Sequence, residues 1–210
     1  MKVTFIQHRC NSVDSIKNLS LHFGAEIDLR YHNQDLVLSH DPFHGDKAEL
    51  FIDFLNEWSK LQDRGPLILN TKTEGIEDNC IFLMNKFKIT NWFFLDLSMP
   101  YFVKYSHSKI SNPIMFNENN LAVRFSEHEP MEYALSFANK VGWVWVDCFT
   151  KMPLTADIYQ KLKDHHFKIC LVSPELQKHD VAKIGEYKKQ LSIHNLFIDA
   201  ICTKRPDLWH

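Results

Sequence analysis

The sequence predicts a compact (β/α)₈ barrel of the α/β class, and three observations lead to that prediction. Short apolar runs rich in Val, Ile, Phe and Trp alternate with segments of helical character, the pattern of a parallel sheet whose crossovers are helices. There are eight such runs, the strand number of this barrel. Each run begins apolar and ends polar, so the polar residues are expected to meet at the carboxyl-terminal mouth, where such barrels place their chemistry.

The expected strands and helices follow one another with short connections. Strands are expected at residues 3–8, 25–30, 67–72, 92–98, 121–126, 143–149, 168–173 and 198–203. Helices are expected at residues 13–22, 47–62, 74–88, 100–108, 130–140, 155–165 and 180–191. The stretch 36–40, "LVLSH", is an extra strand-like piece, close enough to the second strand to form a hairpin arm with it.

The length of the chain favours a single domain over residues 1–210, because it allows one sizeable core and is short for two ordinary domains. The carboxyl end, "RPDLWH", leaves no room for a full eighth helix, which is therefore expected to be short or missing. The barrel wall is expected to be thin there or to be covered by a partner. A second copy of the chain could be that partner, so a homo-oligomer is one of the expected states.

Composition excludes several classes of protein. With 45% hydrophobic residues and a net charge of −2, the chain has the signature neither of disorder nor of a broad nucleic-acid-binding surface. Five scattered cysteines without a C-x-x-C pair argue for reduced thiols rather than disulfides or a zinc knuckle. No signal-peptide-like run follows the amino terminus, and no segment reaches about 18 apolar residues, so we expect a cytoplasmic protein without stable membrane insertion.

The second expected strand, "AEIDLR", carries charge on one face. Alternate residues of a strand share a face, so Glu26, Asp28 and Arg30 point one way and the apolar residues between them point the other. Two carboxylates directed into a barrel cost several kcal/mol unless a cation or a strong hydrogen-bonding set compensates them. A bound metal ion would do so. The alternative is a partly solvated strand on which both carboxylates merely pair with Arg30 or Lys72.

Four segments, taken together, resemble the glycerophosphodiester phosphodiesterase family and its phosphatidylinositol-phospholipase-C-like relatives. They are "HRCNS" at 8–12, "FGAEIDLRYHNQDLVLSHDPF" at 23–43, "LILNTK" at 67–72 and "IDAICTKRPDL" at 198–208, in the family's order, spacing and strand context. The resemblance implies a (β/α)₈ barrel that hydrolyses phosphodiesters with a divalent metal and two histidines. The connection after Asp41 is too short for the small inserted subdomain that many members carry, so none is expected.

The resemblance assigns four residues to acid–base catalysis and phosphate binding. His8 and His40 match the family's acid/base pair, and Arg9 matches the arginine that contacts the substrate phosphate. Lys72 matches the basic residue two positions beyond the third metal ligand, and it is expected to bind phosphate as well. Two histidines suit a reaction in which the attacking hydroxyl loses a proton and the leaving oxygen gains one near neutral pH.

The resemblance also implies a metal site, with one departure from the family. Glu26 and Asp28 match two metal-binding carboxylates, but Asn70 stands where the family usually has a glutamate. The amide oxygen of Asn70 can still bind a hard cation such as Mg²⁺ or Ca²⁺, although the site then has one negative charge fewer. Asp96 or Asp147, each near the end of another strand, is an alternative source of that charge.

The predicted function is metal-dependent hydrolysis of a small soluble phosphodiester, such as a glycerophosphodiester or another glycerol- or sugar-linked diester. Two alternatives stay open: a weak or inactive barrel that binds a phosphorylated ligand, and a phospholipase-type enzyme. The second needs an apolar rim, for which the sequence offers only Phe43, Tyr101, Phe102 and the loop at 114–116.

Two tryptophans share a strand face with one of the strand-end aspartates. Trp143 and Trp145 lie four and two residues before Asp147, so all three are expected on the same side of the strand. They are expected in the core, and the lining of the substrate pocket by one of them is the alternative.

Overall fold

Eight parallel strands form a closed ring in the part of the chain that the structure describes, which confirms the predicted barrel. The computed structural model describes residues 3–42, 48–61, 63–107 and 116–210. Neighbouring strands pair in parallel around the ring, and one bridge between Phe94 and Leu121 joins the fourth strand to the fifth. The ring consists of β1 (Thr4–Gln7), β2 (Gly24–His32), β5 (Leu67–Thr71), β6 (Trp92–Leu95), β7 (Ala122–Phe125), β8 (Trp143–Val146), β9 (Lys168–Val172) and β10 (Ala200–Thr203).

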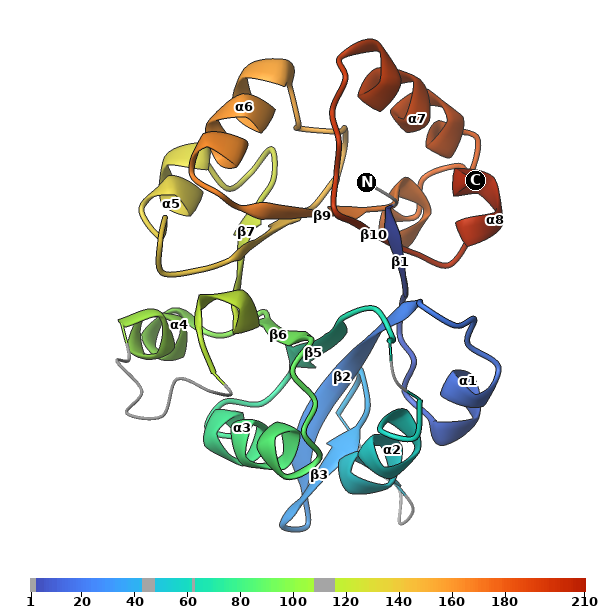
Figure 1. Cartoon of the computed structure of the whole chain (residues 1–210), viewed down its shortest axis with the longest axis vertical. Helices are drawn as coiled ribbons and strands as arrows, with labels where there is room; N and C mark the ends of the chain where they lie inside the picture. Colours follow the sequence, from blue (N-terminus) through green and yellow to red (C-terminus); the bar gives the residue numbers. More distant parts are fainter. Residues whose placement is uncertain (1–2, 43–47, 62, 108–115) are drawn as a thin grey trace.

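Helices surround the ring on its outer side (Figure 1). Several expected helices are shorter than predicted. Turns bonded from i to i−3 replace the last helical turns after Lys17 and after Leu135. The helix expected at 47–62 spans only Phe51–Trp58, because Glu49–Leu50 form a strand instead. The helices are α1 (Val13–Lys17), α2 (Phe51–Trp58), α3 (Glu77–Lys86), α4 (Met99–His107), α5 (Met131–Leu135), α6 (Ala156–Asp164), α7 (Lys183–Ile193) and α8 (Pro206–Trp209), with 3₁₀ helices at Glu118–Asn120 and Pro174–Gln177.

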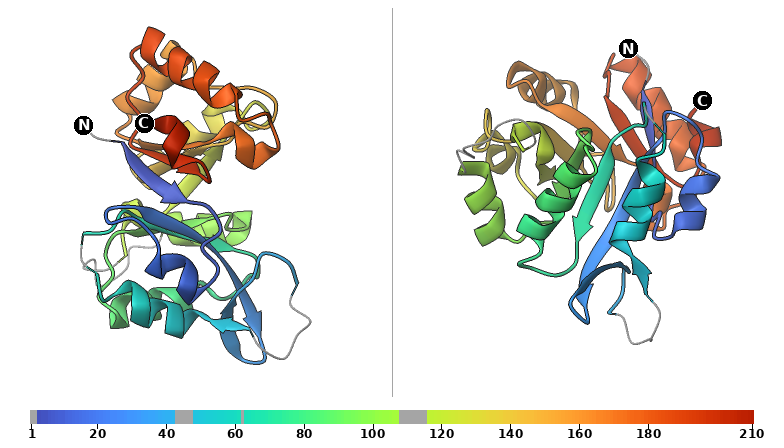
Figure 2. Two further views of the ribbon diagram at one scale, coloured as in Figure 1. Left: turned by 90° about the vertical axis from the view of Figure 1, so that its right-hand side faces the viewer. Right: turned by 60° about the horizontal axis from the view of Figure 1, so that its bottom comes forward.

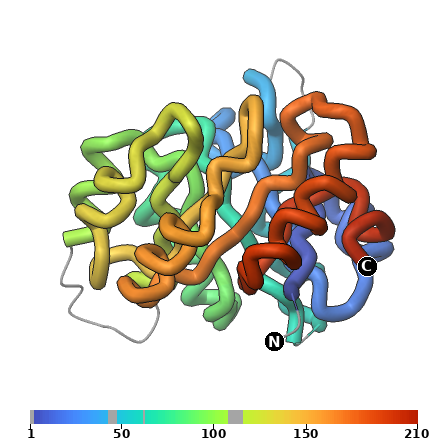
Figure 3. The backbone as a smooth tube through the Cα atoms, turned by 90° about the horizontal axis from the view of Figure 1, so that it is seen from above, coloured from blue at the N-terminus to red at the C-terminus, as the bar shows by residue number. Residues whose placement is uncertain are grey.

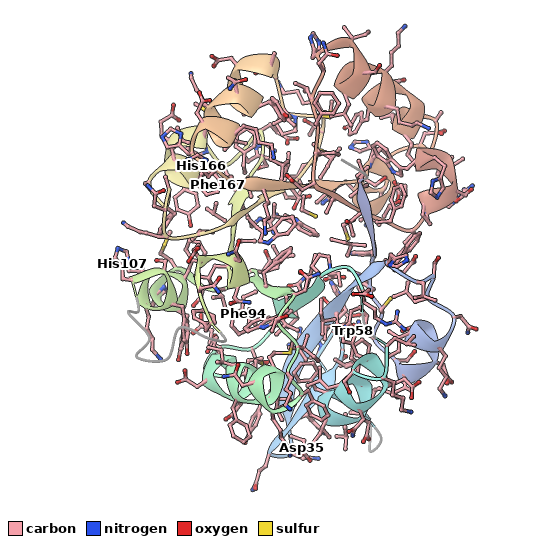
Figure 4. All side chains as sticks on the ribbon, viewed as in Figure 1. Asp35, Trp58, Phe94, His107, His166 and Phe167 are labelled. Atoms are coloured by element: carbon pink, nitrogen blue, oxygen red, sulfur yellow. The ribbon has the colours of Figure 1, made fainter. Side chains whose placement is uncertain are left out.

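A hairpin arm extends β2 beyond the barrel, as the sequence predicts (Figure 2). Strand β3 (Asp35–Leu38) pairs antiparallel with the end of β2, and Asp35 lies at the outer end of the arm (Figure 4). The two-residue loop of Asn33 and Gln34 has positive φ at both positions, the geometry of a type I′ turn. The sequence did not predict β4 (Glu49–Leu50), which pairs with β3. The described residues between Asp41 and β5 form β4 and α2, and they contain no inserted subdomain.

The core has two layers because side chains alternate across each strand. Within the ring, Phe93 stacks on Trp143 at a centroid distance of 4.9 Å. Trp143 is thus a core residue, as expected. Outside the ring, residues such as Ile27 and Leu29 pack under the helices. The inner layer consists of Ile6, Ile68, Phe93, Leu95, Ala122, Trp143, Trp145, Cys170, Val172, Ala200 and Cys202.

The outer layer supplies a large part of the stability, which a matched pair of phenylalanines can test. Phe54 of α2 is fully buried against Trp58, with ring centroids 5.9 Å apart, whereas Phe82 of α3 is 64% exposed. Phe54→Ala is expected to lower the free energy of unfolding by about 3–5 kcal/mol because it leaves a cavity. Phe82→Ala is expected to change it by less than about 0.5 kcal/mol.

Urea titration measures both changes as a shift of the midpoint at constant slope. Similar midpoint shifts for the two variants would contradict the assignment of Phe54 to the outer layer of the core.

The eighth helix is short, as predicted, and hydrogen bonds hold its carboxyl-terminal end. Trp209 of α8 donates a hydrogen bond from Nε1 to Ser173 Oγ at 2.8 Å, and Lys188 Nζ of α7 donates to the carbonyl oxygens of Leu208 and His210 at 3.1 and 2.6 Å. Figure 3 shows the last turn of the chain beside its first strand. A groove of about 670 Å³, lined largely by apolar side chains including Phe5, follows the outer wall beside α8. The wall is therefore thin here.

Two further expectations concern cysteines and membranes. All five cysteines are buried and carry free thiols. None of the helices in the described residues combines the length and the apolar character that crossing a bilayer requires.

Candidate active site

The carboxyl ends of the barrel strands enclose a cavity of about 230 Å³. Side chains from β2, β5, β6, β7, β8 and β9 and from the turn after β1 line it, together with the 3₁₀ helix at Pro174–Gln177. All seven residues that the sequence singled out are in its wall, which places them close enough to act together. They are His8, Arg9, Glu26, Asp28, His40, Asn70 and Lys72.

His8 lies directly after β1, held by a 3.2 Å hydrogen bond from its backbone nitrogen to Thr203 O of β10. Its Nε2 is 3.8 Å from Glu26 Oε2, and its buried Nδ1 has no hydrogen-bond partner. Burial, and to a smaller extent the nearby positive charges of Arg9 and Lys204, lower the pKa of His8 to about 3. The imidazole is therefore uncharged near neutral pH.

Arg9 has a strained backbone that serves the site. Its φ of +55° lies in the left-handed region that residues with a side chain rarely adopt. In this conformation its backbone N–H donates to Glu26 Oε2 at 2.8 Å, and its Nε lies 4.0 Å from Asp28 Oδ2. The turn after β1 thus connects a cationic side chain to the two carboxylates of β2.

Glu26 and Asp28 are fully buried, so each depends on the hydrogen bonds that it receives. Asn70 Nδ2 donates to Glu26 Oε1 at 2.9 Å, because β2 and β5 pair in a register that sets Asp28 beside Asn70. Asn11 donates from Nδ2 to Asp28 Oδ2 at 2.8 Å and accepts from the backbone nitrogen of Asp28 at 2.8 Å. Burial raises the pKa of Glu26, and the neighbouring charge of Asp28 raises it further.

The polar atoms left over in this cluster fit a hard divalent cation. Asp28 Oδ1 and Asn70 Oδ1 are buried and have no hydrogen-bond donor, and carboxylate and amide oxygens are the ligands that Mg²⁺ and Ca²⁺ prefer. Among the residues that the structure describes, no group of three His, Cys, Asp or Glu side chains is placed to bind one metal ion. A metal site here therefore depends on the oxygen of Asn70 in addition to the two carboxylates.

An ion-pair chain of alternating sign runs from the same cluster around the mouth. Lys72 Nζ is 3.5 Å from Asp28 Oδ1 and 3.8 Å from Asp96 Oδ2. The Arg124 guanidinium continues the chain, with Nη1 2.6 Å from Asp96 Oδ1 and Nη2 2.6 Å from Asp147 Oδ2. Asp96 and Asp147 thus bind Arg124, and the suggestion that either supplies the third acidic metal ligand is not favoured. The sequence by itself assigned no role to Arg124.

Arg30 positions His40 rather than a carboxylate. Its Nη2 donates to the backbone oxygen of His40 at 2.8 Å, and its Nη1 donates to that of Lys72 at 3.2 Å. The alternative in which Arg30 neutralises the carboxylates of β2 is therefore wrong, although the pairing of Asp28 with Lys72 is present. His40 lines the cavity, and its Nδ1 is 2.9 Å from Asp41 Oδ1.

Several residues outside this set have a defined place. Trp145 lines the cavity and donates from Nε1 to Asp147 Oδ2 at 3.2 Å, so one of the two tryptophans does reach the pocket. Phe116 is buried, whereas Phe43 and residues 114–115 lie outside the described residues, so the suggested apolar rim is not described there. His107 lies on the outer side of α4, away from the cavity (Figure 4).

Comparisons with known proteins identify the fold. No protein-family model matches the sequence, and no curated protein sequence is significantly similar to it. A glycerophosphodiester phosphodiesterase from Agrobacterium tumefaciens superposes with a TM-score of 0.66 over 99% of both chains at 12% identity. The chain shares the glycerophosphodiesterase fold. A second such structure, from Parabacteroides distasonis, superposes with a TM-score of 0.65 at 14% identity, covering 99% of this chain and 84% of the other.

The glycerophosphodiesterase fold is one version of a widely used barrel. The α subunit of tryptophan synthase from Campylobacter jejuni also superposes, with a TM-score of 0.56 at 9% identity over 96% of this chain and 86% of the other. Because one barrel supports unrelated reactions, the activity of this chain has to be argued from the side chains at its mouth.

Proposed function

We propose that this chain is a metal-dependent phosphodiesterase that hydrolyses a small soluble phosphodiester, a glycerophosphodiester or another glycerol- or sugar-linked diester. The observation that carries the proposal is the composition of the 230 Å³ cavity. It combines two imidazoles, His8 and His40, with the cations Arg9 and Lys72 and with a buried carboxylate pair. Binding of an anion alone does not require a matched pair of proton-transfer groups.

Each of these side chains has a step that its chemistry suits. Arg9 presents a planar, permanently charged fork to the phosphate, and Lys72 adds a second positive charge. One of His8 and His40 removes the proton of the attacking hydroxyl, and the other donates a proton to the leaving oxygen.

The metal in this proposal is Mg²⁺ or Ca²⁺, held by Glu26, Asp28 and the amide oxygen of Asn70. When bound, it supplies positive charge that stabilises the phosphate oxygens as their charge grows in the transition state. The hydrogen bonds from Asn11 and from Arg9 N orient the two carboxylates for this purpose.

The size and polarity of the cavity favour a small soluble substrate over a phospholipid. Its volume of about 230 Å³ is below the roughly 300–1,000 Å³ of pockets that hold drug-sized ligands. Charged side chains dominate the described part of its wall. Cosedimentation with liposomes checks this point, and binding to them would favour the phospholipase alternative.

The test of the proposal is hydrolysis of a panel of phosphodiesters with Mg²⁺, Ca²⁺ or Mn²⁺ and with EDTA. The panel comprises glycerophosphocholine, glycerophosphoethanolamine, glycerophosphoinositol and a chromogenic phosphodiester. We expect turnover that requires the metal. Binding of phosphorylated compounds without turnover under any condition would contradict the proposal and favour a barrel that only binds its ligand.

Replacing Asn70 by glutamate restores the missing charge and provides a separate test. Asn70→Glu is expected to tighten binding of Mg²⁺ or Ca²⁺ by about tenfold or more, because a third carboxylate faces the same ion. Calorimetric titration of the metal measures the change. Unchanged or weaker affinity would show that position 70 is not a ligand, and Asn79→Glu, at an exposed position of α3, is the control for added charge.

A further inference from the structure

We propose that Asp147 determines specificity by binding hydroxyl groups of the substrate's alcohol, so that the preferred substrates carry a small polyol. The inference rests on the proposed phosphodiesterase function and concerns the half of the cavity opposite His8 and the carboxylates of β2. Neither proton transfer nor metal binding, as argued above, uses Asp147.

Asp147 is a prepositioned hydrogen-bond acceptor. It lies directly after β8 and is 3% exposed. Its Oδ2 accepts from Arg124 Nη2 at 2.6 Å and from Trp145 Nε1 at 3.2 Å, and its Oδ1 accepts from Gln177 Nε2 at 2.6 Å. An ionised carboxylate has about four acceptor positions, so one position on Oδ1 is available to a ligand hydroxyl. Three fixed donors also prevent the carboxylate from rotating away.

The charges in the cavity direct the phosphate away from Asp147. The Arg124 guanidinium is committed to three carboxylates: Nη1 to Asp96 at 2.6 Å, Nη2 to Asp147 at 2.6 Å and Nε to Glu129 at 3.1 Å. It therefore has little positive charge to offer a substrate anion, and the carboxylates around it repel one. The phosphate belongs beside Arg9 and Lys72, which leaves the Asp147 half for the alcohol.

The walls of this half suit the carbon chain and hydroxyl groups of a polyol. Leu95, Val172 and Leu176 line the same cavity and offer apolar contact to a short carbon skeleton. Hydroxyl groups then reach the carboxylate of Asp147 as donors and the Gln177 amide as a further partner. A site that hydrogen-bonds a hydroxyl strongly rejects analogues that lack it, because its buried polar groups are then left unpaired.

The same walls do not suit a quaternary ammonium group, which binds over open aromatic faces. The Phe149 ring is already flanked by the Arg124 guanidinium at 5.7 Å and by the His128 ring at 5.9 Å. Trp145 is 5% exposed, and its indole N–H is bonded to Asp147. In the described part of the cavity wall, therefore, no aromatic cage for choline is formed.

A binding experiment tests the inference without requiring turnover. Calorimetry with Mg²⁺ present compares inorganic phosphate, sn-glycerol 3-phosphate and phosphocholine on the natural protein and on Asp147→Asn. We expect the natural protein to bind sn-glycerol 3-phosphate the most tightly of the three. The substitution is expected to weaken that complex by about tenfold or more and to change binding of inorganic phosphate less than about twofold. Equal losses for all three ligands, or no loss, would overturn the inference.

Two further variants separate recognition from general disturbance. Glu129→Gln removes a carboxylate from the same guanidinium outside the cavity wall, and it is expected to leave the ligand preference unchanged. Gln177→Ala removes the donor to Asp147 Oδ1. It is expected to weaken binding of sn-glycerol 3-phosphate, by less than Asp147→Asn does. This variant tests the inference even if Asp147→Asn does not fold. A loss in Glu129→Gln equal to that in Asp147→Asn, or unaltered preference in Gln177→Ala, would overturn the inference.

Kinetics distinguish a failure of this inference from a failure of the proposed function. In Asp147→Asn, kcat/KM for glycerophosphoglycerol is expected to fall about tenfold or more because KM rises. For bis(p-nitrophenyl) phosphate, whose alcohols carry no further hydroxyl groups, kcat/KM is expected to stay within about twofold of the natural value. Parallel loss on both diesters would overturn the specificity role. If the natural protein hydrolyses neither diester, the phosphodiesterase function is wrong, and the binding comparison decides the hydroxyl site by itself.

Discussion

The largest expected effect on activity is that of removing the imidazole of His8. His8→Ala is expected to lower kcat by at least about 10²-fold, the usual contribution of a general acid or base. The imidazole stands 3.8 Å from the Glu26 carboxylate at the floor of the cavity, and its buried Nδ1 has no protein partner, so no structural bond is lost with it. The measurement is metal-saturated turnover of the best diester in the panel.

His40→Ala is expected to cause a loss of the same order, because the reaction needs both a proton acceptor and a proton donor. His107→Ala serves as the matched control, since this histidine is exposed on the outer side of α4, and its rate is expected to equal that of the natural protein. A rate near the natural value for His8→Ala or His40→Ala removes that residue from the mechanism.

The second large effect is on stability, through the metal. A ligand at 100 times its Kd stabilises the folded state by about 2.7 kcal/mol. For a chain of this size that corresponds to a rise in Tm of roughly 5–10 °C. Addition of Mg²⁺ or Ca²⁺ to the EDTA-treated protein is expected to produce this rise, because the ion compensates two fully buried carboxylates. Differential scanning calorimetry across a metal titration measures it.

The rise is expected to disappear in Asp28→Asn, which removes one of the two charged ligands. Glu77→Gln is the matched control, because Glu77 is also a buried carboxylate, 1% exposed, but belongs to α3 rather than to the cavity. It is expected to keep the full metal-dependent rise. If Asp28→Asn retains the rise as well, the ion binds elsewhere on the protein.

Local patterns were sufficient to predict the barrel and most of its mouth. Strand periodicity and the polar residue at each strand end are properties of a few consecutive residues, and they correctly placed Glu26, Asp28 and Lys72 at one mouth. The two-residue hairpin after β2 was equally local. Helix ends were less well predicted, since α1 stops at Lys17 where the chain turns to reach β2.

The sequence by itself determined the fold class, the parallel order of the strands and the residues that reach the mouth. Only the tertiary structure decided how those residues are paired. The partners in these interactions are far apart in the sequence. Asn11 and Asp28 are 17 residues apart, Arg124 and Asp96 are 28 apart, and Arg124 and Asp147 are 23 apart. Such pairs depend on strand register and on closure of the ring, which no local pattern specifies, so the use of Asp147 against Arg124 became evident only in three dimensions.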